Sequence, residues 1–256
     1  MDNKLLICSH SGGLDSSTVI AKAIAEGYIV QPVNFLYGQR NEIEETAQFN
    51  VWVEYKQRYQ ERIRDCIQLD IGTMLGSFKE QYQKIRDNGS VHEKTELEFY
   101  TPFRNLVFSS ICAMVGEIQA MTEDINEIAV AIGVHKHSSE SYKKDYWDIT
   151  PEFVNRLNSI FELNDGLKVS VYAPYANLYK EAIIKDAIDL DVPYKLTWSC
   201  YSPVTHEFTT AEGVESVETT PCLKCEACLE REIQGSKVGV DDINDYRIVK
   251  IRIKDL

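Results

Sequence analysis

The sequence predicts an α/β fold in which a parallel sheet is flanked by helices. Short apolar runs alternate along the chain with helical stretches, which is typical of parallel strands joined by right-handed crossovers. The first apolar run leads through a glycine pair into a second apolar stretch, a pattern that indicates a strand, a loop and a helix. With 256 residues, 44% of them hydrophobic and 26% charged, the chain suits one large domain, or one domain with a small appendage.

Each expected strand is a short apolar run, and these runs lie at residues 5–8, 29–37, 64–71, 127–134 and 168–173. The expected helices lie between and after them, at residues 16–26, 41–60, 105–120, 152–164 and 180–190. Gly27 ends the first helix. The second helix has one apolar face at helical spacing, made of Ile43, Ala47, Val51 and Tyr55. The third is apolar enough to be buried on much of its surface.

Two stretches fall outside this alternation. Residues 72–99 are polar and weakly periodic, and a connection of this length is expected to form a flap near the site. Residues 249–254 alternate apolar and basic side chains. This period of two predicts a half-buried strand that adds to a sheet edge, either its own or a partner's.

The net charge of −13 disfavours a nucleic-acid binder that relies on general attraction to phosphates. No run approaches the roughly 18 consecutive apolar residues of a membrane span, and no cleavage-site pattern follows the N-terminus. We therefore expect a cytoplasmic protein.

The most informative stretch is Ser-His-Ser-Gly-Gly-Leu-Asp-Ser-Ser at residues 9–17. A loop between a strand and a helix offers backbone N–H groups to an anion, and Gly12 and Gly13 remove the Cβ atoms that would keep a phosphate away. Asp15 is a candidate ligand for Mg²⁺, which proteins hold with one or two carboxylates plus phosphate oxygens. The stretch is neither a Walker A loop nor a dinucleotide fingerprint. Ser-Gly-Gly-x-Asp-Ser resembles the pyrophosphate loop (PP-loop) of the N-type ATP pyrophosphatases, which implies ATP binding.

Seven cysteines include three at two-residue spacing, Cys222, Cys225 and Cys228. In a reducing compartment this cluster favours a metal over disulfides. Three thiolates need a fourth ligand to close a structural zinc site, and Cys200 is the best candidate. An iron–sulfur cluster is the alternative. The remaining cysteines, which lie in apolar segments, are expected to be inert core residues: Cys8, Cys66 and Cys112.

Taken together, the loop and the cysteines resemble one family, the 7-cyano-7-deazaguanine synthases (QueC). Further segments in the same order resemble that family too, among them Tyr37-Gly-Gln-Arg40 and Arg104-Asn105 at the start of a helix. The resemblance covers nearly the whole chain. It implies a Rossmann-like fold of the adenine nucleotide alpha hydrolase type, with an ATP-binding domain at 1–195 and a small zinc-binding subdomain with the C-terminal strand at 196–256.

The chain departs from the family pattern in segments expected to line the acceptor pocket. Asn41 stands where the family usually has His, and Phe103 where it has Gly. The residues that follow Gly133-Val134 differ as well, and the gap between Cys200 and Cys222 is longer than usual. These departures leave the ATP and zinc elements intact.

The resemblance implies a ligase that adenylates 7-carboxy-7-deazaguanine with ATP, amidates it with ammonia and proceeds to the nitrile, with Mg²⁺ and Zn²⁺ bound and a homodimer as its assembly. Its expected catalytic residues are Asp15, Arg104 and Lys180. Its expected ATP-binding residues are Ser9, Ser11, Gly12, Gly13, Leu14, Asp15, Ser16 and Ser17. Its expected substrate-binding residues are Tyr37, Arg40, Phe103, Arg104, His135 and Asp148. Candidate bases are His135, His137, Asp148 and Glu98.

Three alternatives remain open at this point. The chain could join a deazaguanine acid to an amine on a protein or nucleic acid, since the segment at 133–150 is altered. It could be a tRNA sulfur transferase, which the acidic charge and the closed four-cysteine pattern oppose. It could also be a non-catalytic nucleotide-binding module, although the intact loop argues against this.

Overall fold

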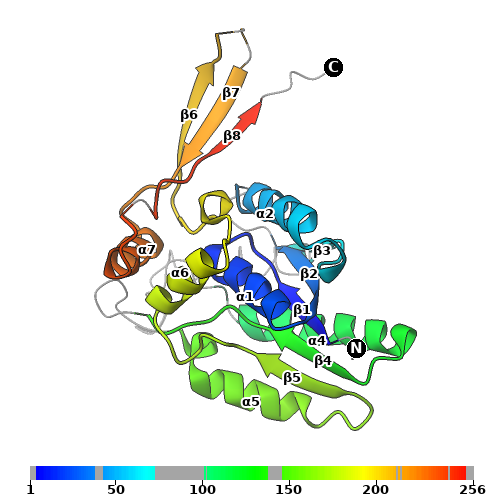
Figure 1. Ribbon diagram of the computed structural model, residues 1–256. Coiled ribbons are helices and arrows are strands. Elements are labelled where there is room, and N and C mark those ends of the chain that lie inside the picture. The colour runs from blue at the N-terminus through cyan, green and yellow to red at the C-terminus, as the bar shows by residue number, and fades with distance from the viewer. Residues whose placement is uncertain are drawn as a thin grey trace, which may run out of the picture.

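The molecule is built around a parallel sheet with the strand order β3-β2-β1-β4-β5 (Figure 1). This computed structural model describes residues 4–37, 43–72, 101, 103–137, 146–211, 213, 215–241 and 243–251. The strands of the parallel sheet are β1 (Leu5–Ser9), β2 (Ile29–Leu36), β3 (Ile67–Asp70), β4 (Glu127–Ala131) and β5 (Lys168–Tyr172). Strand β1 pairs with β2 on one side and β4 on the other, so the direction of winding reverses there. Ligands of such sheets bind at this switch point, beyond the carboxyl ends of the strands.

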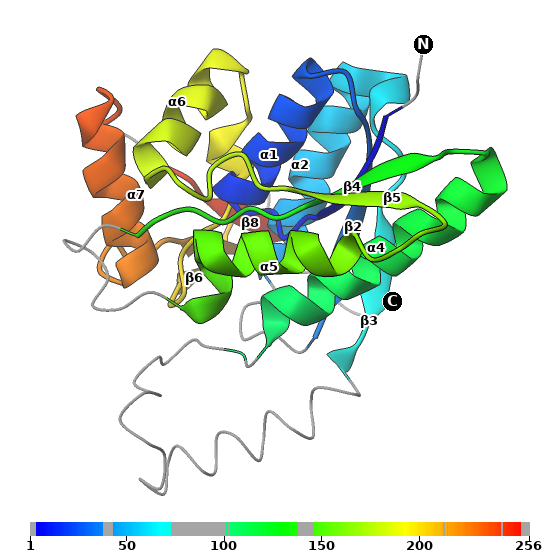
Figure 2. The ribbon, with the colours of Figure 1, turned by 90° about the horizontal axis from the view of Figure 1, so that it is seen from below.

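Helices cover both faces of this sheet (Figure 2). One face carries α1 (Leu14–Ala25), α2 (Ile43–Tyr59) and α6 (Lys180–Asp189). The other carries α4 (Arg104–Glu123) and α5 (Pro151–Phe161). The side chains of β1 alternate accordingly: Leu6 and Cys8 join the core on the α1 side, whereas Leu5 and Ile7 pack with α4.

The predicted α/β architecture is confirmed, and the predicted ends differ from the observed ones by a few residues. The apolar face expected for the second helix is the buried face of α2. Helix α1 begins at Leu14, two residues before the expected start, because Gly13 is its N-cap. Thr150 accepts a hydrogen bond from the Phe153 N–H and caps α5 ahead of Pro151. Short 3₁₀ turns are η1 (Gln60–Arg62), η3 (Trp147–Ile149) and η4 (Tyr194–Leu196).

A second, antiparallel sheet projects from the body of the molecule (Figure 1). It contains β6 (Val204–Thr209), β7 (Glu215–Thr220) and β8 (Ile248–Ile251), with α7 (Glu226–Lys237) lying between β7 and β8 in the sequence. Strand β8 pairs with β7, so the expected C-terminal strand adds to an edge of its own chain over residues 248–251. The hairpin and α7 were not predicted, because β6 is exposed along its whole length and has no buried apolar face.

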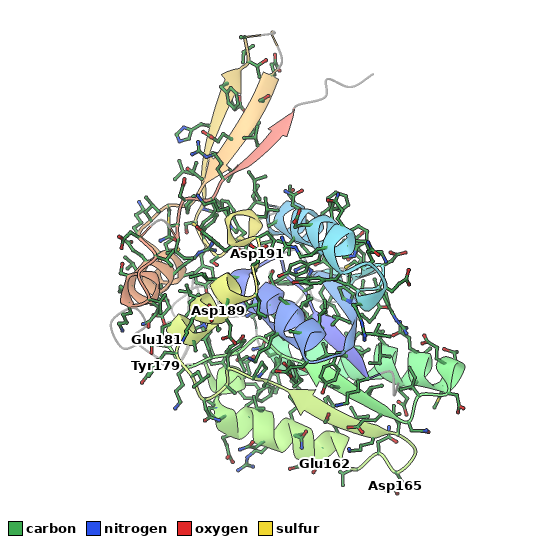
Figure 3. The ribbon with its side chains drawn as sticks, viewed as in Figure 1. Glu162, Asp165, Tyr179, Glu181, Asp189 and Asp191 are labelled. Carbon is green, nitrogen blue, oxygen red and sulfur yellow. The ribbon has the colours of Figure 1, made fainter. Side chains whose placement is uncertain are left out.

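Acidic side chains lie on the outside of the molecule. Glu162 and Asp165 follow α5, and Asp189 and Asp191 lie at the end of α6 (Figure 3). Within the described residues, no helix is long and apolar enough to cross a membrane. The flap expected at 72–99 lies outside the described residues apart from Gly72.

Candidate active site and metal centre

A cavity of about 280 Å³ opens at the carboxyl ends of β1 and β4, at the switch point of the sheet. Its walls come from the loop after β1, the first turns of α1 and α4, the segment after β4, and residues 198–201. The lining includes most of the predicted site residues that the structure describes, namely Ser9, Ser11, Gly13, Leu14, Asp15, Ser16, Tyr37, Arg104, His135 and Lys180. The sheet topology therefore brings together residues that are far apart in the sequence.

The loop at 9–17 is shaped by its two glycines in different ways. Gly12 has a φ of +76°, and a Cβ there would lie 2.3 Å from the backbone N of Gln48. Gly13 has an ordinary φ of −76° and caps α1 without a side-chain hydrogen bond, so of the two glycines only Gly12 has a positive φ. Because no side chain caps this end of α1, the N–H groups of its first turn can bind an anion.

Two loop serines bond locally. The hydroxyls of Ser16 and Ser17 donate to the Gly13 carbonyl at 3.2 Å and 2.8 Å. Ser17 is fully buried, and neither it nor Gly12 lines the cavity. Ser17 and Gly12 therefore shape the loop. The groups available to a ligand are the N–H groups of α1 and the Ser11 side chain.

Asp15 forms an ion pair with Lys180 inside the cavity. The Lys180 Nζ lies 2.7 Å and 3.0 Å from the two carboxylate oxygens, and the His135 Nε2 lies 3.5 Å from one of them. Lys180 and His135 are buried, whereas the side chain of Asp15 keeps 26% of its surface exposed. Burial opposes ionisation of Asp15, but Lys180 and His135 outweigh it and hold its pKa well below the ordinary value. Asp15 is therefore a carboxylate that faces the cavity.

Arg104, at the start of α4, also lines the cavity. It is hydrogen-bonded to Tyr37, which follows β2 and packs its ring edge-on against Phe108. Glu44, in the first turn of α2, also lines the cavity. Burial raises the pKa of Glu44 to about 7, against the opposing charge of Arg104. The site thus holds an arginine close to an acid whose pKa is about 7.

Sequence reasoning missed Glu44 and His10. His10 is fully buried, lines the cavity, and lies between Ser17 Oγ and Gln48 Nε2 at 3.3 Å each. Burial lowers its pKa to about 3, so it is neutral. Glu44 could have been found as an acid directly after Ile43, in the first turn of the helix that follows β2.

Three predicted substrate residues are not in the described cavity. Phe103 is 57% exposed and packs edge-on against Trp147, so its contact with a substrate stays a prediction. Asp148 is buried, and its carboxylate accepts from the Asn105 N–H at 3.4 Å, which places it at the start of α4. Arg40, like Glu98, lies outside the described residues.

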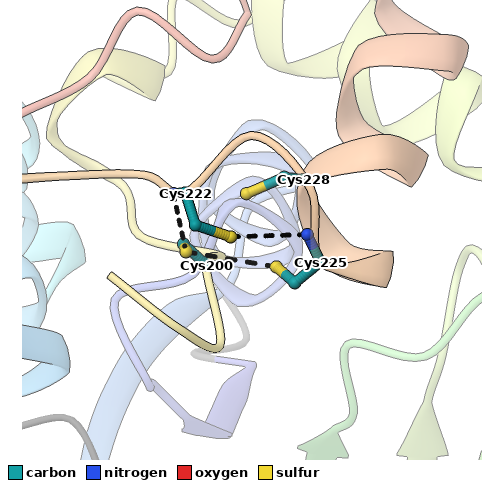
Figure 4. A group of neighbouring side chains, drawn as sticks. All are labelled: Cys200, Cys222, Cys225 and Cys228. Atoms are coloured by element: carbon teal, nitrogen blue, oxygen red, sulfur yellow. Dashed lines mark hydrogen bonds between the residues drawn. The ribbon is translucent and has the colours of Figure 1, made fainter. Parts of the chain in front are cut away.

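The four predicted metal cysteines converge at the N-terminal end of α7 (Figure 4). Their sulfur atoms all lie within 4.8 Å of one another. In a tetrahedral zinc site with Zn–S bonds of about 2.3 Å, the sulfur atoms are about 3.8 Å apart, so the cluster fits such an ion after a small contraction. The Cys222 and Cys225 N–H groups donate to Cys200 Sγ at 3.2 Å and Cys222 Sγ at 3.3 Å.

The other cysteines lie apart from this cluster. Cys8 and Cys112 are fully buried, as expected for inert core thiols. Cys66 is half-buried and accepts a hydrogen bond from Gln48 Nε2 at 3.2 Å, so the expectation that it belongs to the core is only partly correct. Burial raises the pKa of Cys66 to about 11, which keeps its thiol protonated and unreactive.

The sheet order and the Ser-Gly-Gly-Leu-Asp-Ser loop at its switch point define an ATP-using enzyme of the PP-loop class. Within that class, the chain belongs to the QueC family, since the model described as "Queuosine biosynthesis protein QueC" matches residues 5–237. Several curated relatives are named 7-cyano-7-deazaguanine synthase. The one from Picrophilus torridus is 31% identical over 94% of this chain and 90% of its own length. The one from Thermoplasma acidophilum is 30% identical over 100% and 97%.

Solved structures resemble the chain less closely. The structure of NMN synthetase from Francisella tularensis matches with a TM-score of 0.37 and 15% identity, over 76% of this chain and 64% of that one. This likeness is too distant to carry an argument about function. The family assignment therefore depends on the sequence matches and agrees with the PP-loop resemblance expected from residues 9–17.

Proposed function

We propose that this chain uses ATP to adenylate the carboxylate of 7-carboxy-7-deazaguanine, joins it to ammonia, and converts the amide to 7-cyano-7-deazaguanine. One observation carries the proposal. The uncapped N-terminus of α1, Arg104 and Lys180 share a single cavity, in a chain whose curated relatives are named for that product. The cavity thus offers sites for two anions, a triphosphate and a carboxylate, next to each other.

Activation is needed because a carboxylate has no good leaving group. Attack of a carboxylate oxygen on the α-phosphate of ATP releases pyrophosphate and gives an acyl adenylate, from which AMP is a good leaving group. The N–H groups of α1 and the Ser11 hydroxyl would hold the phosphates, and Arg104 would grip the carboxylate with its planar guanidinium. Asp15 would hold Mg²⁺, which neutralises phosphate charge. Positioning the two anions and stabilising the developing charge are the main catalytic tasks.

Ammonium must lose a proton before it can attack the acyl adenylate, so a base is useful. Glu44 suits this role, because it lines the cavity and its pKa of about 7 matches the working pH. His135 is less suitable, since its Nε2 is directed at Asp15. Loss of AMP from a second adenylation, this time of the amide oxygen, would then leave the nitrile.

The four cysteines would hold Zn²⁺ as a structural ion, which supplies a cross-link between residues 200 and 222–228. The division into domains at 1–195 and 196–256, a homodimeric assembly and a cytoplasmic location belong to the same proposal. The local sheet of β6, β7 and β8 supports the separate C-terminal subdomain. Size-exclusion chromatography with light scattering measures the assembly directly.

A product assay tests the proposal. Purified protein is incubated with 7-carboxy-7-deazaguanine, ATP and ammonium, and the products are read by mass spectrometry. We expect the nitrile, AMP and pyrophosphate, all dependent on the acid. Lys180→Met should abolish AMP release, whereas Lys185→Met, on the exposed side of α6, should not. Absence of AMP with every substrate present would exclude the proposal.

A second candidate function is transfer of the activated acid to an amine on a protein. The antiparallel sheet favours it, because three apolar residues on one face of that sheet are about half exposed: Val204, Phe208 and Val249. Intact-mass analysis of co-purified proteins should then show a deazaguanine adduct. Formation of free nitrile alone would count against this function.

A further inference from the structure

Arg231 on α7 is fully buried although it carries a permanent charge. Its guanidinium makes four hydrogen bonds, all to neutral oxygens: Ile243 O at 2.8 Å, Thr197 Oγ1 at 3.1 Å, Ser199 Oγ at 3.2 Å and Tyr194 O at 2.8 Å. Its Cζ lies 4.3 Å from the centre of the Tyr246 ring. No carboxylate of the described residues is among its hydrogen-bond or ion-pair partners. A buried charge is costly unless an opposite charge compensates it.

The four-cysteine site can supply that opposite charge. Cys228 lies one helical turn before Arg231, so the two side chains lie on the same side of α7. Tyr246, which stacks on the guanidinium, belongs to the same buried cluster as Cys200 and Cys228. Four thiolates around one divalent zinc ion leave a net charge of about −2. A guanidinium beside such a centre is therefore electrostatically paired.

The same guanidinium holds a segment that touches the nucleotide loop. Thr197 and Ser199, which accept bonds from Arg231, flank Trp198 on both sides. The backbone N–H of Trp198 donates to the Gly12 carbonyl at 2.9 Å, and its indole N–H donates to the Cys200 carbonyl at 3.0 Å. A Cβ on Gly13 would lie 3.2 Å from the Trp198 carbonyl oxygen, so loop and segment are in close contact.

We propose that Arg231 is a positioning residue that couples the four-cysteine site to the ATP loop. The metal–thiolate centre balances its charge. Its planar guanidinium fixes residues 197–199, so that the Trp198 N–H stays hydrogen-bonded to the Gly12 carbonyl. The proposal rests on the proposed function, since it takes residues 9–17 as the nucleotide site and zinc as the ion. It adds that the metal site acts on nucleotide affinity from a distance.

Three variants separate charge from geometry. Arg231→Met removes both the positive charge and the planar hydrogen-bonding group. Bound zinc should therefore fall well below one ion per chain, and the Kd for ATP should rise about tenfold. Arg231→Lys keeps the charge and loses the planar group, so zinc should stay bound while the Kd rises. Thr197→Val removes one acceptor at a fully buried position outside the cavity lining, and should keep zinc while raising the Kd about fivefold.

Zinc is measured by elemental analysis and the Kd for ATP by calorimetry on the full-length protein without the acid substrate. Arg247→Met, at an exposed arginine near β8, is the control and should change neither quantity. Full zinc and an unchanged Kd in Arg231→Met would overturn the inference. If that variant does not fold, an unchanged Kd in both Arg231→Lys and Thr197→Val overturns it. A wild-type protein that binds no ATP would overturn the proposed function instead.

Discussion

The Asp15 carboxylate lies beside Lys180 and His135 in the cavity. Replacing Asp15 should therefore change both ATP turnover and the stability of the fold. Asp15→Asn should lower ATP turnover at least a hundredfold, because the variant loses the carboxylate proposed to hold Mg²⁺. From the sequence alone one expects folding to be nearly unchanged. The structure alters that expectation, because Asn leaves the buried Lys180 ammonium unpaired. The free energy of unfolding should fall by about 1–3 kcal/mol.

The pH dependence provides a second check on Asp15. Its pKa lies below the ordinary 3.8, so the unfolded chain binds a proton more readily than the folded one. The carboxylate therefore stabilises the fold above about pH 4, and this contribution is lost as the pH falls further. Urea unfolding at pH 3 and pH 7 should show a smaller difference between wild type and Asp15→Asn at pH 3. The control Asp189→Asn, at a surface residue, should have the same free energy of unfolding as the wild type at both pH values.

The effect of Glu44 on the pH dependence of stability has the opposite sign to that of Asp15. Since burial raises its pKa from 4.5 to about 7, the folded state holds the proton more tightly than the unfolded state. Stability from this group is present below about pH 4.5 and declines as the pH rises through 7. Glu44→Gln should therefore be more stable than wild type at pH 8, on the order of 1–2 kcal/mol, and equal to it at pH 4.

The same variant tests the proposed base. Glu44→Gln should lower amide formation about a hundredfold at saturating ATP, because no carboxylate is left to take the ammonium proton. Glu45→Gln, at an exposed neighbour, is the control for amide formation. Wild-type amidation by Glu44→Gln would assign the proton transfer to another group.

Residues of the loop could be predicted individually because they follow one another in a recognisable order. Lys180 could be placed at a helix start, but its ion pair with Asp15 depends on the crossover that brings α6 beside α1. Glu44 resembles many exposed acids on helices, and only the cavity distinguishes it. The sequence pattern did not indicate that Phe103 has a left-handed φ of 57° at the N-cap of α4, where its ring is exposed.

At the scale of elements, the turn between β1 and α1 depends on one glycine. Gly12→Ala would require a Cβ 2.3 Å from the Gln48 nitrogen on α2, in addition to a positive φ. The backbone of α2 cannot yield, so we expect a loss of at least about 2 kcal/mol and strongly reduced ATP binding. Gly27→Ala is the matched control. Gly27 has a φ of +93° but no atom within 4 Å of the added Cβ, so that variant should lose only about 1 kcal/mol and bind ATP normally.

Elements with a buried apolar face were predictable, and elements without one were not. Helix α2 shows four apolar residues at i, i+4 spacing, and these are buried as expected. Helix α7 buries Glu230, Arg231 and Gln234, so its inner face is polar and gives no periodic signal. Strand β6 has no buried face at all. In these parts, tertiary contacts and the cysteine site replace the hydrophobic pattern on which the prediction depends.

At the scale of the whole molecule, the cysteine cluster joins residue 200 to residues 222–228 at the start of α7. Cys225→Ser should lower zinc content and melting temperature together, because metal binding is coupled to folding. A chelator should produce the same shift in the wild type. Cys66→Ser, outside the cluster, should keep full zinc. A Cys225→Ser protein with one zinc per chain and an unchanged melting temperature would contradict a four-cysteine site.

The bond between Trp198 and Gly12 has a consequence for synthesis of the protein. The loop at 9–17 is synthesised well before its partner, because Gly12 and Trp198 lie 186 positions apart in the chain. A growing chain that has already folded β1 and α1 still lacks the contact that fixes Gly12. Nascent and C-terminally truncated chains should therefore bind ATP weakly, so incomplete copies of this protein would consume little of the nucleotide pool.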